Sequence, residues 1–183
     1  MLVSTFLIQP IPAEAVVTDQ RCAADSCVTI SRIMLPEDAN PAGIVHGGAI
    51  MKEIDNAAGV VAVRHTRKIC VTASIDRLDF HKPAFIGNLV TVKASVNMTG
   101  KTSMEIGTRV ETEDLLSGKK THLASAYLTF VALGDDHRPT QVPPLNPATP
   151  DETRRHREAL ARREARLAEK TREKECQMDD SKC

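Results

Sequence analysis

Residues 40–48 read NPAGIVHGG, and a long apolar segment follows them as far as His65. The proline and glycine residues of the first part predict a loop. From residue 48 to residue 65 the apolar side chains recur at steps of three and four, which predicts one long helix. Gly47 and Gly48 lie at the join, where the amides of a helix start lack intrahelical acceptors and can face a ligand. We therefore expect the fold and its site to be organised around this loop and helix.

Asp55 lies two turns into the predicted helix, among apolar neighbours on two adjacent stripes. Apolar residues on more than one face indicate that the helix is covered on more than one side, as by a sheet wrapped around it. A carboxylate in such surroundings costs free energy unless something uses it, so Asp55 is a candidate catalytic acid. The simpler alternative is a surface acid, and the simpler alternative for Asn40 is a turn residue before Pro41.

Strand patterns lie before and after the helix. One alternating segment precedes it and four follow it, at residues 28–33, 71–76, 90–98, 104–111 and 122–132. The connections at Gly100 and Gly118 are short enough for hairpins. The order of one strand, one helix and four mostly antiparallel strands predicts an α+β fold in which a curved sheet surrounds one central helix.

The sequence divides into four parts. An N-terminal arm occupies residues 1–26, and the α+β domain occupies residues 27–138. Residues 139–150 contain five prolines and are predicted to form an extended linker, because proline cannot continue a sheet. Residues 151–183 mix basic and acidic side chains with a thin apolar stripe, which predicts a solvated helix that docks loosely on the domain and ends in a frayed tail. Binding of an anionic partner is the alternative use of this helix.

The composition excludes several classes of protein. Lys and Arg together number 24, as do Asp and Glu, so the zero net charge gives no overall attraction to nucleic acid or to an anionic membrane. The five cysteines are odd in number and scattered, which fits a reduced cytoplasmic protein better than a disulfide scaffold or a zinc site. Residues 1–8 lack the basic residues of a signal peptide, and no segment approaches the ~18–20 apolar residues of a membrane span.

Other catalytic motifs are incomplete. Residues 99–102 read TGKT, like the end of a phosphate-binding loop, but Ser95 stands where that loop requires its first glycine. The segment also joins two predicted strands, which excludes a nucleotide triphosphatase, although its lysine and hydroxyls could still meet a phosphate. The histidines show no metal-ligand spacing, so no metal site is expected. No Gly-x-Ser-x-Gly motif indicates a serine hydrolase.

Five ordered motifs resemble those of the hotdog-fold acyl-CoA thioesterases over residues 28–145. They are PEDAN (36–40), VHGG (45–48), ID (54–55), CVTASID (70–76) and TGKTSMEI (99–106). The resemblance implies the hotdog fold, in which an antiparallel sheet wraps one long helix. It also implies homodimers with active sites at their interface that assemble as trimers of dimers. One departure is Ile44, where several relatives have asparagine.

The resemblance also implies roles for particular residues. Asn40 and Asp55 match the catalytic pair, which two-domain relatives divide between their domains, so Asn40 of one copy is expected to face Asp55 of another. The implied reaction is hydrolysis of fatty acyl-CoA to a fatty acid and CoA, with Asp55 as general base or nucleophile. CoA is part of the substrate and product, so no further cofactor is expected. The backbone amides of Gly47 and Gly48 are predicted to hold the oxyanion. The predicted contacts to substrate and CoA come from His46, Arg64, Arg77, Lys101, Thr102 and Ser103.

Two other functions remain open from the sequence. A non-enzymatic acyl-CoA sensor would use the same fold as a binding module, although the presence of both Asn40 and Asp55 disfavours it. A hotdog dehydratase acting on 3-hydroxyacyl thioesters would need a catalytic histidine beside an acid, and His46 is the only nearby candidate. Release of free CoA would distinguish the hydrolase from both.

Overall fold

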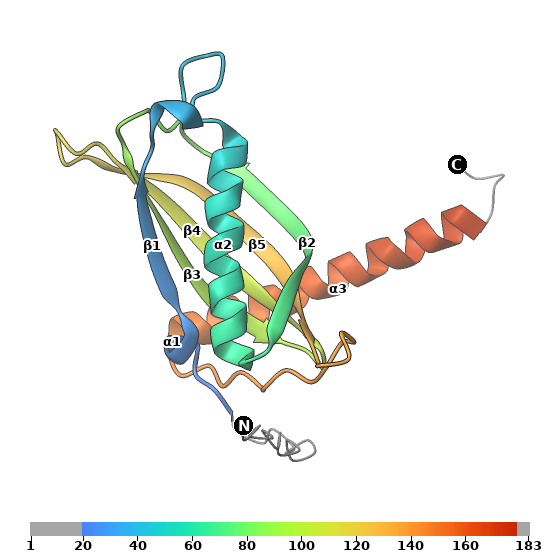
Figure 1. Ribbon diagram of the computed structural model, residues 1–183. Helices are drawn as coiled ribbons and strands as arrows, with labels where there is room; N and C mark the ends of the chain where they lie inside the picture. The colour runs from blue at the N-terminus through green and yellow to red at the C-terminus, as the bar shows by residue number, and fades with distance from the viewer. Residues whose placement is uncertain (1–19, 179–183) are drawn as a thin grey trace, which may run out of the picture.

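The alternating segments of the sequence form one antiparallel sheet around the predicted helix (Figure 1). The computed structural model describes residues 20–178, so most of the predicted N-terminal arm and the end of the tail lie outside the described residues. The elements are α1 (Ala23–Ser26), β1 (Val28–Ile33), the 3-10 helix η1 (Pro36–Asp38), α2 (Gly47–Thr66), β2 (Ile69–Phe80), β3 (Leu89–Thr99), β4 (Ser103–Glu113), β5 (Lys120–Leu133) and α3 (Pro150–Met178). The predicted α+β class and the order of strand, helix and four strands are confirmed.

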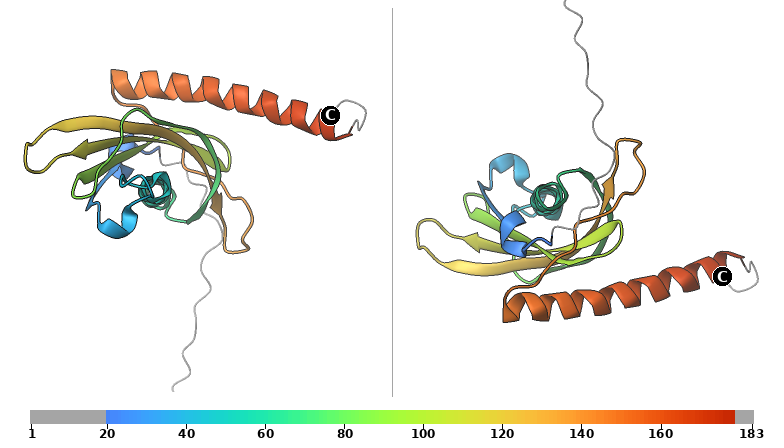
Figure 2. Two further views of the ribbon diagram at one scale, coloured as in Figure 1. Left: turned by 90° about the horizontal axis from the view of Figure 1, so that it is seen from above. Right: turned by 90° about the horizontal axis from the view of Figure 1, so that it is seen from below.

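The sheet has the strand order β1-β3-β4-β5-β2, and every pair of neighbouring strands is antiparallel. β3, β4 and β5 follow one another through hairpins, as the short connections predict, whereas β1 and β2 occupy the two edges. Figure 2 shows the sheet curved around α2, with α3 on the opposite, outer side. This is the hotdog arrangement that the resemblance implies.

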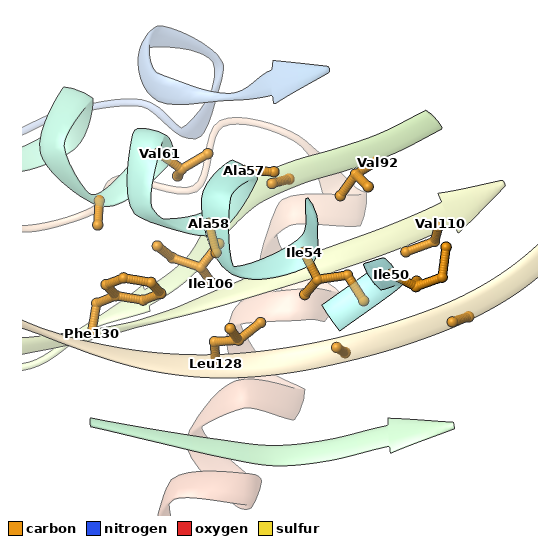
Figure 3. Close-up of a cluster of buried hydrophobic side chains, with 14 of the residues drawn as sticks. Ile50, Ile54, Ala57, Ala58, Val61, Val92, Ile106, Val110, Leu128 and Phe130 are labelled. Atoms are coloured by element: carbon orange, nitrogen blue, oxygen red, sulfur yellow. The ribbon is translucent and has the colours of Figure 1, made fainter. Parts of the chain in front are cut away.

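The apolar face of α2 fills the concave side of the sheet. Ile50 and Ile54 are 1% exposed, and Ala57, Ala58 and Val61 are fully buried. Figure 3 shows this face of the helix against side chains of the neighbouring strands, namely Val92, Ile106, Val110, Leu128 and Phe130. Each buried isoleucine or valine stabilises the fold by roughly 1.5–3 kcal/mol. The apolar spacing of the helix therefore decides which of its faces is inside.

β2 is the strand for which the alternating pattern is misleading. Val71 and Ile75 alternate with polar residues in the sequence, but they are 44% and 39% exposed, so the alternation does not mark a buried face here. Two register shifts, after Thr72 and after Ile75, break the alternation, and no strand in the described part of the chain pairs with the outer edge of β2. Exposed apolar side chains lie along β2 at Ile69, Val71 and Ile75, and these three residues are called the β2 strip below. Such strips mark surfaces that another chain covers.

Residues 139–150 contain no regular helix or strand before α3 begins, but they pack against the domain. Val142 and Pro143 are buried, and the Val142 amide donates to the Lys101 carbonyl at 3.0 Å. The Pro143 carbonyl lies 3.0 Å from Nε2 of His65, a fully buried residue whose pKa is lowered by its burial. The segment thus covers the end of α2 and leads the chain to the outer face of the sheet.

α3 crosses the outer face of the sheet strand by strand (Figure 2). The contacts in chain order are Arg155 with Ser95 of β3, Arg162 with Glu105 of β4 and with Tyr127 of β5, and Arg166 with Asp76 of β2. The guanidinium of Arg162 stacks 3.7 Å from the ring centre of Tyr127. The sequence predicts loose docking, but specific contacts hold the helix as far as Arg166, and residues 167–175 are exposed.

A buried carboxylate under α3 depends on this docking. Glu105 is 1% exposed, and its oxygens accept hydrogen bonds from Arg162 Nη2 at 2.6 Å and Arg162 Nε at 3.2 Å. Asn97 Nδ2 donates to Glu105 Oε1 at 3.0 Å. Gly107 makes room for this amide, because a Cβ there would lie 2.4 Å from Asn97 Nδ2. The network pairs a charge that would otherwise be costly to bury.

Replacement of Arg162 by alanine is expected to lower the free energy of unfolding by about 3 kcal/mol, because the buried Glu105 loses its partner. Urea unfolding followed by circular dichroism measures the loss. The matched control is Arg172→Ala, at an exposed position of the same helix, which should change stability by less than about 0.5 kcal/mol. Equal stability of the two variants would show that the domain does not depend on docked α3.

Candidate active site

Asn40 is held in a closed loop between η1 and α2. An isolated bridge between Ala39 and Val45 joins the two ends of the loop. The Asn40 Oδ1 atom accepts hydrogen bonds from the amides of Ala42 at 2.9 Å and Ile44 at 3.3 Å. The Nδ2 group has no acceptor among residues 20–178. The loop therefore orients the Asn40 side chain and leaves its amide nitrogen free to donate.

The start of α2 uses one of the two predicted oxyanion donors for itself. His46 is the N-cap residue, and its Nδ1 atom accepts a hydrogen bond from the Gly48 amide at 2.8 Å. A Cβ at Gly48 would lie 2.9 Å from that nitrogen, so glycine is needed for the imidazole to approach. The Gly47 amide has no acceptor in the described part of the chain. The Gly47 amide is thus free to donate to a ligand, whereas the Gly48 amide already donates to His46, which caps the helix.

A pocket of about 440 Å³ lies between the Asn40 loop, the start of α2 and the end of β2. Its apolar walls come from Ile44, Val45, Ile50, Phe80 and Leu123. Its polar groups come from Asn40, Gly47, His81 and Lys82. An apolar cavity with a few convergent polar groups is the usual form of a small-molecule site.

Asp55 lies away from this pocket, beside the open edge of the sheet. It is eight residues after Gly47, or about 12 Å along the helix axis. Its Oδ1 atom accepts a hydrogen bond from Thr72 Oγ1 on β2 at 2.6 Å. Thr72 directly precedes the first bulge of β2, and bulges often aim side chains next to active sites. Within one chain, Asp55 therefore contacts Thr72 and lies apart from the pocket that Asn40 lines.

Sequence reasoning assigns no site role to Thr72, Phe80 or His81. The only signal for Thr72 is its place in the CVTASID motif, and its contact with Asp55 depends on how β2 meets α2. Phe80 is an aromatic residue at a strand end in a chain that is 3% aromatic, which is a weak indication. These residues become candidates only when the fold brings β2 against α2 and the loop.

Apart from His46, the predicted CoA-binding residues lie in three places. Arg64, near the end of α2, donates to two backbone carbonyls of the α1 region at 2.9 and 3.3 Å. Arg77 on β2 pairs with Asp79 at 2.5 Å. Residues 101–103 lie at the hairpin between β3 and β4, where Lys101 is exposed and its ammonium has no partner within the described residues. Lys101 is therefore the most available cation of the predicted set.

No group of three or more histidine, cysteine, aspartate or glutamate side chains among residues 20–178 is arranged to hold a metal ion. Over the same range, no helix is both long enough and apolar enough to cross a membrane. Cys22, Cys27, Cys70 and Cys176 are free thiols, and burial raises the pKa of Cys70.

Known sequences related to this chain include thioester hydrolases. The model of the thioesterase superfamily matches residues 42–119. YkhA of Bacillus subtilis, an uncharacterized acyl-CoA thioester hydrolase, is 37% identical over 141 residues, which cover 77% of this chain and 81% of that protein. The cytosolic acyl coenzyme A thioester hydrolase of Homo sapiens is 39% identical over 129 residues, which cover 69% of this chain but 34% of the human protein.

Solved structures of acyl-CoA hydrolases share the fold. The Bacillus cereus enzyme is 38% identical with a TM-score of 0.82, covering 87% of this chain and 98% of that one. The Staphylococcus aureus enzyme, solved with butyryl coenzyme A, coenzyme A and coenzyme A disulfide, is 32% identical with a TM-score of 0.80, covering 86% and 96%. It has also been solved with an aspartate, a threonine or an asparagine changed to alanine. A hexameric acyl-CoA thioesterase is 35% identical with a TM-score of 0.79, covering 82% and 96%.

Substitution of His46 by alanine is expected to destabilise the start of α2 by about 1 kcal/mol, because the Gly48 amide loses its acceptor. In His46→Asn the side-chain oxygen can cap the same amide, so most of the loss should be recovered. The midpoint of urea unfolding compares the two variants. If asparagine proved as destabilising as alanine, the imidazole would have a role other than capping the helix.

Proposed function

Because the chain belongs to the acyl-CoA thioester hydrolases of the thioesterase superfamily, we propose that it hydrolyses fatty acyl-CoA in a site formed by two copies of the chain. The observation that carries this proposal is the spacing of Asn40, Asp55 and Thr72. Asn40 precedes Asp55 by 15 residues, and Asp55 precedes Thr72 by 17. The asparagine, aspartate and threonine substituted in the Staphylococcus aureus enzyme are separated by the same two intervals.

A second copy supplies what one chain lacks. Asn40 and the Gly47 amide belong to the pocket, whereas Asp55 and Thr72 lie beside the β2 strip. Antiparallel pairing of β2 with β2 of a second copy would cover this strip and bring the pocket end of one copy toward Asp55 of the other. Such a dimer has two equivalent sites. The hexameric relatives support the further assembly of three such dimers.

In the proposed mechanism the thioester carbonyl oxygen accepts hydrogen bonds from the Gly47 amide and Asn40 Nδ2, which stabilise the developing oxyanion. Asp55 takes a proton from water as the oxygen of that water attacks the carbonyl carbon. The C–S bond then breaks, and the CoA thiolate takes the proton from Asp55, so thioester and water give a fatty acid and free CoA. Thr72 holds Asp55 Oδ1, which fixes the carboxylate and leaves Oδ2 for the water. The reaction needs no cofactor beyond the CoA of the substrate.

The two ends of the substrate meet different parts of the site. The apolar walls of the pocket suit an acyl chain that runs along the start of α2. Lys101, with the hydroxyls of Thr102 and Ser103 beside it, suits the CoA phosphates because its ammonium is unpaired in the described structure. Arg64 and Arg77 already bind protein atoms, so they contribute only if those contacts exchange for phosphate.

The geometry disfavours the two alternative functions. Nδ1 of His46 accepts the Gly48 amide, so the neutral imidazole carries its proton on Nε2 and has no free lone pair for a dehydratase base. A binding module needs no carboxylate oriented by a hydroxyl, so the Asp55–Thr72 pair disfavours a sensor. A cytoplasmic location is part of the proposal, in line with the name of the cytosolic human relative.

Asp55→Asn should lower kcat for CoA release by about 10²–10⁴-fold, because the variant cannot take the proton. Thr72→Val should lower kcat roughly tenfold, because it removes one hydrogen bond to the charged Asp55 carboxylate. A thiol-release assay over acyl-CoAs of graded chain length measures these rates and defines the preferred substrate.

The matched control is Asp135→Asn, at an exposed turn, which should retain wild-type turnover. Undiminished CoA release by a folded Asp55→Asn protein would contradict the mechanism. Tight acyl-CoA binding by the unaltered chain with no CoA release would favour the sensor instead.

A further inference from the structure

α3 is longer than the sheet that it crosses. Its contacts follow the strand order from β3 to β2 and end at Arg166, which pairs with Asp76. Asp76 lies at the second bulge of β2, and Ser74 Oγ donates to its Oδ1 at 3.0 Å. α3 is therefore anchored on the edge strand itself, close in sequence to Thr72.

Residues 167–176 continue the helix past this edge. Figures 1 and 2 show the last part of α3 projecting beyond β2 on the outer side of the sheet. Ten helical residues add about 15 Å. All of them except Cys176 are exposed, and none forms a hydrogen bond or ion pair with the sheet within the described residues. This extension gains none of the tertiary packing from which most helix stability in proteins comes.

Residues 167–176 extend toward the position that a second copy would occupy in the dimer paired along β2. Pairing along β2 makes the two sheets continuous, so the outer face of the second copy extends beneath residues 167–176. The two-fold symmetry of such a dimer would also set the two α3 helices side by side in opposite directions. The contact would then occur twice in each dimer.

We propose that residues 167–176 form an inter-subunit contact with α3 and the outer sheet face of a second copy of this chain. The inference rests on the β2-edge dimer of the proposed function and adds a contact outside its active site. α3 thereby ties two subunits together on the face opposite α2.

The side chains of α3 suit contact with a copy of the same helix. Leu160 and Leu167 are 40% and 52% exposed, and their separation of seven residues places both on one side of the helix. The acids and bases of the projecting segment are equal in number, namely Glu169, Glu173 and Glu175 against Lys170, Arg172 and Lys174. Two antiparallel copies can therefore pair leucines along one side and opposite charges around them without net repulsion.

A chain that ends after Arg166 tests the inference, because it keeps the sheet contacts of α3 and removes the projecting segment. Sedimentation velocity over a dilution series gives the dimer dissociation constant of this variant and of the full chain. We expect the truncation to raise that constant about tenfold or more. An unchanged constant would overturn the inference.

Leu167→Ala removes part of the proposed contact without shortening the chain, so it shows whether the truncation acts through that contact. This variant should raise the dimer dissociation constant several-fold. Arg157→Ala, at an exposed position over the docked half, is the matched control and should leave the constant unchanged. A full chain that stays monomeric would overturn the proposed dimer and this contact together. A dimer that hydrolyses acyl-CoA and is indifferent to both the truncation and Leu167→Ala would overturn only the contact.

Discussion

The packing of α2 against the concave side of the sheet is the constraint on which the rest of the structure depends. The helix cannot rotate without exposing Ile50, Ile54 and Val61, so its orientation is fixed. That orientation places the Gly47 amide at the pocket and directs Asp55 to Thr72. One buried face thus positions both parts of the proposed site, and the length of helix between Gly47 and Asp55 keeps those parts about 12 Å apart in a single chain.

Because the two parts of the proposed site lie apart in one chain, a second copy paired with the exposed edge of the sheet would be needed to bring them together. Edge strands with apolar side chains and unpaired backbone groups are normally concealed or covered. On β2 the exposed strip adjoins Thr72 and Asp55, so the same pairing that covers the strip would complete the site. The outer face contributes as well, because α3 is anchored through Glu105 and Asp76 before it passes the edge. In the proposed dimer, assembly and chemistry are therefore linked through β2.

The parts of the structure that could be predicted from the sequence are those set by local patterns. Residues 28–33 and the boundaries of α2 follow from periodicity and from the glycines at its start. The exposure of Val71 and Ile75 could not be predicted, because alternation does not tell an edge strand from a central one. The Thr72–Asp55 and Arg162–Glu105 contacts join residues distant in the chain, so neither spacing nor charge pattern reveals them.

The central claim is that each site takes Asn40 from one copy and Asp55 from another. Its most direct test is to mix the Asn40→Ala and Asp55→Asn proteins, each with little activity alone, under conditions that exchange subunits. Random pairing makes half of the dimers mixed, each with one intact site, so turnover should recover to roughly a quarter of that of the unaltered protein. If native mass spectrometry showed mixed dimers and turnover did not recover, the shared site would be contradicted.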